Sequence, residues 1–193
     1  MIAPRLLLLT PPSGPLDSFR AALNPIAGAP EAAVLLRRPG ASDRELLADA
    51  AALRGPLPLL VHRRPDLAHL VEAAGVHLPE RALPISKARA LLGDEALIGV
   101  SRHDGPGLAQ AIGADYATLS PFHAVPGKNP PLGVNGFRQA RAMAPPGLAV
   151  LALGGLSLRG CEAAFEANAD GIAVLRGAHE ARGLLDIVRA HKG

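Results

Sequence analysis

Several residue types are scarce in this chain of 193 residues. It contains a single cysteine, Cys161, one tyrosine, four phenylalanines and no tryptophan. One cysteine excludes an intrachain disulfide and a metal site built from several cysteines. Because aromatic side chains are so few, leucine, valine, isoleucine and alanine have to fill the interior. The hydrophobic fraction of 49 % suits an α/β protein whose strands are covered on both faces.

Clustered charge is also missing. The formal net charge is +3 and the isoelectric point about 9.6, but the excess arginines are scattered and no aromatic residues alternate with them. We therefore expect no nucleic-acid partner, and a modest attraction for anionic metabolites. No apolar run approaches the length needed to span a membrane, and the apolar stretch near the N-terminus is too short for a secretory signal. The prediction is a cytoplasmic protein without a membrane partner.

The chain does contain a regular alternation of short apolar runs and amphipathic segments. Eight of the runs have the length and composition of buried parallel strands. They cover residues 5–9, 32–37, 58–62, 75–78, 96–101, 116–120, 148–153 and 171–175. Eight strand–helix units predict an α/β protein with one domain over residues 1–193, closed into a (β/α)8 TIM barrel. The alternative is an open doubly wound sheet, but no Gly-x-Gly-x-x-Gly motif follows the first strand.

Start signals mark several of the predicted helices. The sequence Ser42-Asp-Arg-Glu45 is a capping box, in which serine and glutamate bond each other's backbone N–H, and it predicts a helix that reaches about Leu53. Pro65 begins the third helix and Ser86 lies at the start of the fourth. Ser157 is expected to cap the seventh helix.

The carboxyl ends of the strands surround the active site in such a barrel. Four of the seven histidines fall there: His62, His77, His103 and His123. Histidine titrates near neutral pH and therefore serves as a general acid or base. His62 and His77 close apolar strands, where a structural role is as good an interpretation as a functional one. His123 lies in the long connection 120–133, and long connections in compact domains are usually functional.

Glycine-rich backbone follows the seventh strand. Gly154 and Gly155 precede Ser157 and a predicted helix, and backbone N–H groups at the positive end of a helix bind phosphate. The eighth strand ends beside them at Leu175 and Arg176, and the loops after strands seven and eight are the usual phosphate site of such barrels. Two glycines alone would indicate only a tight turn. The neighbouring arginine favours a phosphate site.

An ordered series of motifs extends from Leu59 to the C-terminus. It comprises Arg63-Arg-Pro-Asp-Leu-Ala68, Gly75-Val-His-Leu78, Ile98-Gly-Val-Ser-Arg-His103, Gly113-Ala-Asp-Tyr116, Leu119-Ser-Pro121, Ala152-Leu-Gly-Gly155 and Ala169-Asp-Gly-Ile-Ala-Val174. Together with the segment 36–47 upstream, these motifs resemble the thiamine phosphate synthase and thiazole tautomerase superfamily. The resemblance implies an eight-unit barrel, a role in thiamine biosynthesis and a small phosphorylated thiazole as the substrate.

The resemblance divides at the site. The synthases of this family join a pyrimidine diphosphate to a thiazole phosphate, and they need Mg²⁺ on carboxylates to neutralise the leaving pyrophosphate. Here His62 and Arg63 replace the expected Asn-Asp, and Glu80 is the one acidic residue left after the fourth strand. The tautomerase branch needs neither a metal nor a diphosphate pocket. The sequence therefore favours a thiazole tautomerase-like isomerase that uses no cofactor and no metal.

The resemblance also implies roles for individual residues. His123 would move the proton, because the tautomerase branch carries a histidine in this loop, and His103 is the second catalytic candidate. The substrate carboxylate and ring would contact Arg37, His77, Ser101, Ser120 and Lys128. The phosphate would contact Gly154, Gly155, Leu175 and Arg176.

Two alternatives stay open at this stage. One is a divergent synthase that joins hydroxymethylpyrimidine diphosphate to thiazole phosphate, for which Mg²⁺ would be the cofactor. The other is a non-catalytic barrel that binds thiazole phosphate or thiamine phosphate. The sequence also leaves open a homo-oligomer.

Overall fold

Eight parallel strands close into a barrel in the computed structural model, which describes residues 2–191. Each strand pairs with its neighbours in chain order, and the last strand pairs with the first. The strands are β1 (Leu6–Leu9), β2 (Ala32–Leu36), β3 (Leu59–His62), β4 (Gly75–Leu78), β5 (Leu97–Arg102), β6 (Tyr116–Leu119), β7 (Ala149–Leu153) and β8 (Gly171–Val174). The predicted single-domain (β/α)8 barrel is confirmed, and every strand boundary lies within one residue of the prediction.

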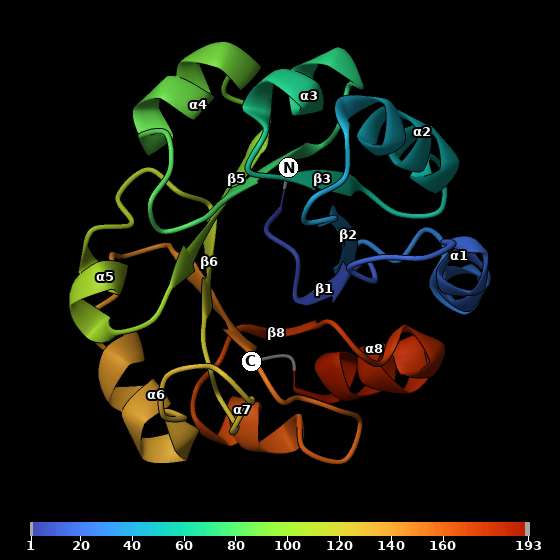
Figure 1. Ribbon diagram of the computed structural model, residues 1–193. Coiled ribbons are helices and arrows are strands. Elements are labelled where there is room, and N and C mark those ends of the chain that lie inside the picture. Colours follow the sequence, from blue (N-terminus) through green and yellow to red (C-terminus); the bar gives the residue numbers. More distant parts are fainter. Residues whose placement is uncertain (1, 192–193) are drawn as a thin grey trace.

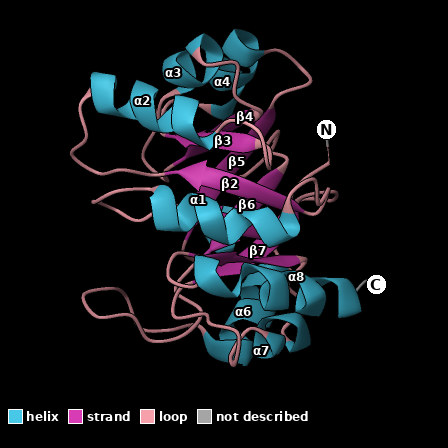
Figure 2. Ribbon diagram, turned by 90° about the vertical axis from the view of Figure 1, so that its right-hand side faces the viewer, coloured by secondary structure: helices cyan, strands magenta, loops and turns pink. Residues whose placement is uncertain are grey.

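Helices surround the barrel on the outside (Figure 1). They are α1 (Asp17–Leu23), α2 (Asp43–Leu53), α3 (Pro65–Leu70), α4 (Ile85–Leu92), α5 (Gly105–Ala109), α6 (Gly133–Arg141), α7 (Glu162–Glu166) and α8 (Ala181–Ala190), with 3-10 turns η1 (Asn24–Ile26) and η2 (Ala178–Glu180). Figure 2 shows the segment before β1 and the end of α8 on the side from which the strands start. The loops that follow the strands lie on the opposite side.

Within residues 2–191, no helix has the length and apolar composition that would cross a membrane.

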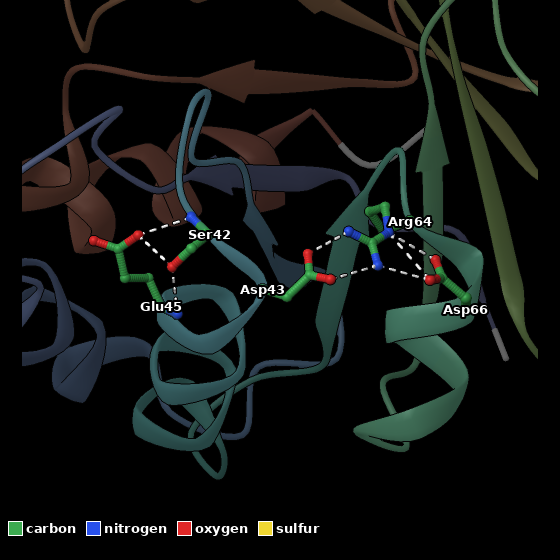
Figure 3. Close-up of polar contacts among 5 residues, drawn as sticks. All are labelled: Ser42, Asp43, Glu45, Arg64 and Asp66. Atoms are coloured by element: carbon green, nitrogen blue, oxygen red, sulfur yellow. Dashed lines mark hydrogen bonds and ion pairs between the residues drawn. The ribbon is translucent and has the colours of Figure 1, made fainter.

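Two of the helix-start predictions have opposite outcomes. The capping box is confirmed, because the Glu45 N–H donates to Ser42 Oγ at 3.3 Å and the Ser42 N–H donates to Glu45 Oε2 at 2.7 Å (Figure 3). The cap at Ser157 is wrong. Its carbonyl accepts the N–H groups of Gly160 and Cys161, which closes a turn, and α7 begins only at Glu162. No helix start therefore follows the Gly-Gly pair directly.

The core has two layers, which follow from the alternation of side chains along each strand. Leu6 and Leu8 of β1 face outward and join the apolar layer under the helices. Leu7 and Leu9 face inward and join a smaller cluster that fills the barrel. Burying one such leucine stabilises the fold by about 1.5–3 kcal/mol. The inner cluster also contains Ala33, Leu35, Leu60, Leu97, Tyr116, Leu151 and Ala173.

Among the described residues, Tyr116 has the one large aromatic ring inside the barrel, and the strand beside it leaves room for this ring. Gly99 on β5 is paired with Tyr116 on β6. A Cβ atom on Gly99 would lie 2.1 Å from the Cζ atom of the tyrosine ring. Because Tyr116 is fully buried, the ring has no free space into which it could move.

We expect Gly99→Ala to destabilise the protein by about 1–3 kcal/mol, the usual cost of overpacking a filled core. Chemical denaturation of the two proteins measures the difference. Gly136→Ala is the matched control, because Gly136 lies within α6 and the new Cβ would be 3.5 Å from the Leu132 side chain, an ordinary contact distance. Alanine is preferred over glycine in a helix by up to about 1 kcal/mol, so this variant should be as stable as the wild type or more so. Equal stability of Gly99→Ala and the wild type would contradict the packing argument.

Candidate functional site

Along each strand, every second side chain faces into the barrel, and this pattern continues to the carboxyl end of the strand. The last inward position at each strand end differs in polarity around the barrel. At the ends of β2 to β6 this last inward position is polar, and at the ends of β7, β8 and β1 it is apolar. The polar positions are Arg37, His62, His77, Ser101 and Thr118. The apolar ones are Leu153, Leu175 and Leu9. We call this ring of residues the mouth, and it is polar over one half and apolar over the other.

A chain of hydrogen bonds connects the barrel interior to the mouth through His77. Its Nδ1 atom lies 3.0 Å from the Tyr116 hydroxyl, and its Nε2 atom lies 2.9 Å from Ser101 Oγ. Thr118 Oγ1 lies 3.5 Å from the same Nε2 atom. Burial lowers the pKa of His77 to about 3, with smaller contributions from the charges of His62, Arg102 and Arg37. At neutral pH this imidazole is uncharged.

His62 stacks beside His77, with ring centroids 6.2 Å apart and planes inclined by 20°. Burial again contributes most to its lowered pKa of about 4, followed by the positive charges of Arg37 and Arg63. Arg37 is held at the end of β2 by Thr10, which is fully buried. The Arg37 N–H donates to Thr10 Oγ1 at 2.9 Å, and that hydroxyl donates to the Arg37 carbonyl at 3.2 Å.

His103 and Ser120 form a second pair on the neighbouring strand ends. The Nδ1 atom of His103 lies 2.8 Å from the Ser120 carbonyl oxygen and 3.2 Å from its hydroxyl. A carbonyl can only accept, so Nδ1 carries the proton, and the Nε2 atom of the neutral ring is an acceptor. His103 can therefore accept a hydrogen bond from a ligand.

His123 lies against the loop that follows β7. Its Nε2 atom is 3.3 Å from the Gly160 carbonyl, and its backbone N–H donates to the Gly154 carbonyl at 3.0 Å. Gly154 and Gly155 have φ angles of +106° and +66°, and a Cβ on Gly155 would lie 2.7 Å from the Cβ of His123. The two glycines thus let the β6–α6 and β7–α7 loops pack together. Their phosphate-binding role stays a prediction.

The predicted site residues therefore fall into separate groups. His77 and Ser101 are bonded to each other, with Arg37 charged nearby. Lys128 and Arg176 are exposed, and within residues 2–191 no hydrogen bond or ion pair connects either side chain to these groups. The sequence interpretation missed Tyr116, Thr118 and Thr10. For the first two, the available signal was the spacing of two residues that places Tyr116, Thr118 and Ser120 on one face of β6.

The donor set of the mouth does not suit Mg²⁺, which prefers carboxylate oxygens and water. The inward residues are arginine, histidine, serine and threonine. Glu80, the acidic residue after β4, is exposed, and its charge acts on the guanidinium of Arg102. In the described part of the chain, no group of three or more histidine, cysteine, aspartate or glutamate residues could hold a metal ion. The residues present do not fit a protein-held magnesium ion.

The fold and the mouth together define a (β/α)8 barrel protein whose candidate site lies at the carboxyl ends of the strands and is polar and partly cationic over one half. The model of the thiamine monophosphate synthase family matches residues 7–178, and the chain belongs to this family.

Individual relatives support the same assignment. The thiamine-phosphate synthase of Chloroflexus aurantiacus is 35 % identical over 152 residues, which are 74 % of this chain and 69 % of the relative. The thiamine-phosphate synthase of Azorhizobium caulinodans is 38 % identical over 152 residues, 74 % of this chain and 71 % of the relative. The solved structure of a thiamine phosphate pyrophosphorylase from Pyrococcus furiosus has a TM-score of 0.81 and 25 % identity, covering 98 % of this chain and 97 % of that chain.

The resemblance to the superfamily and the role in thiamine biosynthesis are confirmed. The prediction of a tautomerase-like isomerase is wrong, because the curated relatives are named thiamine-phosphate synthase, which is a transferase. It rested on His62 and Arg63 in place of the expected Asn-Asp and on Glu80 as the one acidic residue left after β4. Those substitutions remove a metal site, but they do not by themselves remove a site for a diphosphate.

The buried neutral histidines make stability depend on pH. The folded pKa values of His62 and His77, about 4 and about 3, lie below the ordinary value of 6.5. As the pH falls below 6.5, the unfolded chain binds protons that the folded chain does not, so the free energy of unfolding decreases until the folded pKa is reached. Above pH 6.5 these two groups add no pH dependence.

We expect His77→Gln to flatten this dependence by up to about 1.4 kcal/mol per pH unit, the value of one proton. The free energy of unfolding, measured by denaturant titration from about pH 4 to about pH 6.5, gives the two slopes. His69→Gln on α3 is the control, because this histidine is exposed. A slope that is the same in His77→Gln and the wild type would show that His77 is not held neutral.

Proposed function

We propose that this chain catalyses the thiamine-phosphate synthase reaction, in which hydroxymethylpyrimidine diphosphate is joined to thiazole phosphate. The observation that carries the proposal is the 35 % identity with the Chloroflexus synthase over 74 % of the chain. A cytoplasmic location and a homo-oligomer stay predictions.

The reaction forms one bond and breaks one. The lone pair of the thiazole nitrogen forms a C–N bond to the methylene carbon of the pyrimidine. The C–O bond from that carbon to the diphosphate breaks, and its electron pair leaves with pyrophosphate. No net proton transfer is required, so the site has to position two anions, stabilise the leaving group and exclude water.

The two halves of the mouth suit these tasks. Leu9, Leu153 and Leu175 offer an apolar wall against which an aromatic ring can pack. On the polar side, Ser101 offers a hydroxyl that carries no charge and that is held in place by the neutral ring of His77. Neutral donors and acceptors of this kind can bind a pyrimidine amine or ring nitrogen without repelling either substrate.

The thiazole phosphate is assigned to the loops after β7 and β8. Gly154 and Gly155 present backbone there, and Arg176 follows the end of β8. This is the position at which barrels of this class usually bind phosphate.

The test is to incubate the purified chain with both substrates and to measure the products by chromatography. Thiamine phosphate and pyrophosphate should form in equal amounts. Ser101→Ala should lower kcat/KM by about tenfold, because one hydrogen bond is worth about 0.5–1.5 kcal/mol and 1.36 kcal/mol corresponds to a factor of ten. Arg20→Ala is the matched control, since Arg20 is an exposed residue of α1, and it should leave turnover unchanged.

Absence of thiamine phosphate from every reaction would contradict the proposal. If thiazole phosphate or thiamine phosphate then binds to the purified chain, the non-catalytic barrel becomes the correct interpretation.

A further inference from the structure

We infer that Arg37 and Arg63, with His62 between them at the ends of β2 and β3, form a metal-free binding site for pyrophosphate. In this site, arginine side chains take the place of a magnesium ion on carboxylates. The inference rests on the proposed function, because pyrophosphate is the leaving group of that reaction. It goes beyond that function by naming the side chains that bind the negatively charged leaving group.

The two arginines that follow β2 differ in their partners, because within the described residues Arg38 is paired and Arg37 is not. Arg38 Nη1 donates to the Gly14 carbonyl at 2.7 Å, and Arg38 Nε lies 3.4 Å from Asp49 Oδ2. Arg37 continues the inward side of β2 and is half-buried. Within residues 2–191, no carboxylate pairs with its guanidinium. The chain neutralises one arginine and leaves the charge of the other at the mouth.

The same separation occurs after β3. Arg64 lies between two carboxylates, with Nη1 2.6 Å from Asp43 Oδ1 and Nη2 2.7 Å from Asp66 Oδ2 (Figure 3). Arg63 is exposed, and in the described part of the chain no carboxylate pairs with it. Two neighbouring strand ends therefore each carry one paired and one unpaired arginine.

The backbone at Arg63 indicates that its position is held in place. Its φ angle is +69°, a left-handed backbone conformation that residues other than glycine rarely adopt. The Arg63 N–H donates to the His77 carbonyl at 2.8 Å, and the next residue is clamped by Asp43 and Asp66. Strained residues that the surrounding structure holds in this way cluster at functional sites.

The groups between the arginines suit an anion and disfavour a cation. His62 is neutral, with its pKa lowered to about 4 by burial and by the charges of Arg37 and Arg63. The same two charges would repel a metal ion. A guanidinium presents several N–H groups in a fixed plane that matches the oxygens of a phosphoryl group. Neighbouring strands lie about 4.8 Å apart, a separation that two linked phosphoryl groups can bridge.

The experiment is titration calorimetry of the full chain with inorganic pyrophosphate in a buffer that contains EDTA. The wild type should bind, Arg37→Ala and Arg63→Gly should each bind at least tenfold more weakly, and Arg20→Ala should bind like the wild type. Glycine at position 63 removes the charge and accepts the positive φ angle, so this variant keeps its fold. Replacing EDTA by Mg²⁺ should not strengthen binding to the wild type, because the metal binds the free pyrophosphate in solution and no side chain of the site holds it.

Two outcomes would overturn the inference. One is no pyrophosphate binding in EDTA, and the other is binding in EDTA that neither arginine variant weakens. Turnover of the two substrates in EDTA and in Mg²⁺ separates this inference from the proposed function. Thiamine phosphate formed only with Mg²⁺ would leave the proposed function standing and overturn the inference. If no thiamine phosphate forms under either condition, the function fails, and the calorimetric comparison still decides whether the arginine site exists.

Discussion

A tyrosine hydroxyl buried inside a barrel filled by leucine has to be paired, because an unpaired one costs about 1–3 kcal/mol. Tyr116 is fully buried, and its ring occupies the space left by Gly99. The hydroxyl is paired with His77, whose other nitrogen reaches Ser101. One packing choice deep in the barrel therefore requires a neutral histidine on β4 and a hydroxyl at the end of β5. The polar half of the mouth is built on this chain of contacts.

The charges at the mouth follow from a second constraint, the pairing of neighbouring arginines. Arg38 and Arg64 are bound by carboxylates on α2 and α3, which hold the ends of β2 and β3 to the helices beside them. Arg37 and Arg63 are left at the mouth. Because their charges also help to keep His62 neutral, the electrostatic character of the site is cationic overall with uncharged hydrogen-bonding groups inside it.

Much of the fold could be predicted from the sequence, because buried parallel strands are short apolar runs that end in glycine, serine, proline or a polar residue. The strand 75–78 was predicted to the residue, and the capping box at Ser42 was correct. The start of α7 was missed because the carbonyl of Ser157, and not its hydroxyl, closes the following turn. A serine before an apolar segment does not show which of these two bonds will form.

The site could be predicted in part. Strand ends identified His77, Ser101 and Arg37 as mouth residues, and the structure places them there. The bond between His77 and Tyr116 joins residues 39 positions apart, and no local pattern reveals such a pair. The isomerase prediction is contradicted by the relatives named thiamine-phosphate synthase, and it rested on local sequence alone. Missing carboxylates were visible in the sequence, whereas the different pairing of Arg37 and Arg38 becomes visible only when the positions of Asp49 and Gly14 are known.

The most direct measurement is a crystal structure of the chain grown with inorganic pyrophosphate and Mg²⁺ together. The account predicts pyrophosphate bonded to the guanidinium groups of Arg37 and Arg63, with no metal ion bound to a side chain at the mouth. A magnesium ion held by Glu80 or another carboxylate of the chain, with the pyrophosphate on that ion and away from both arginines, would contradict it.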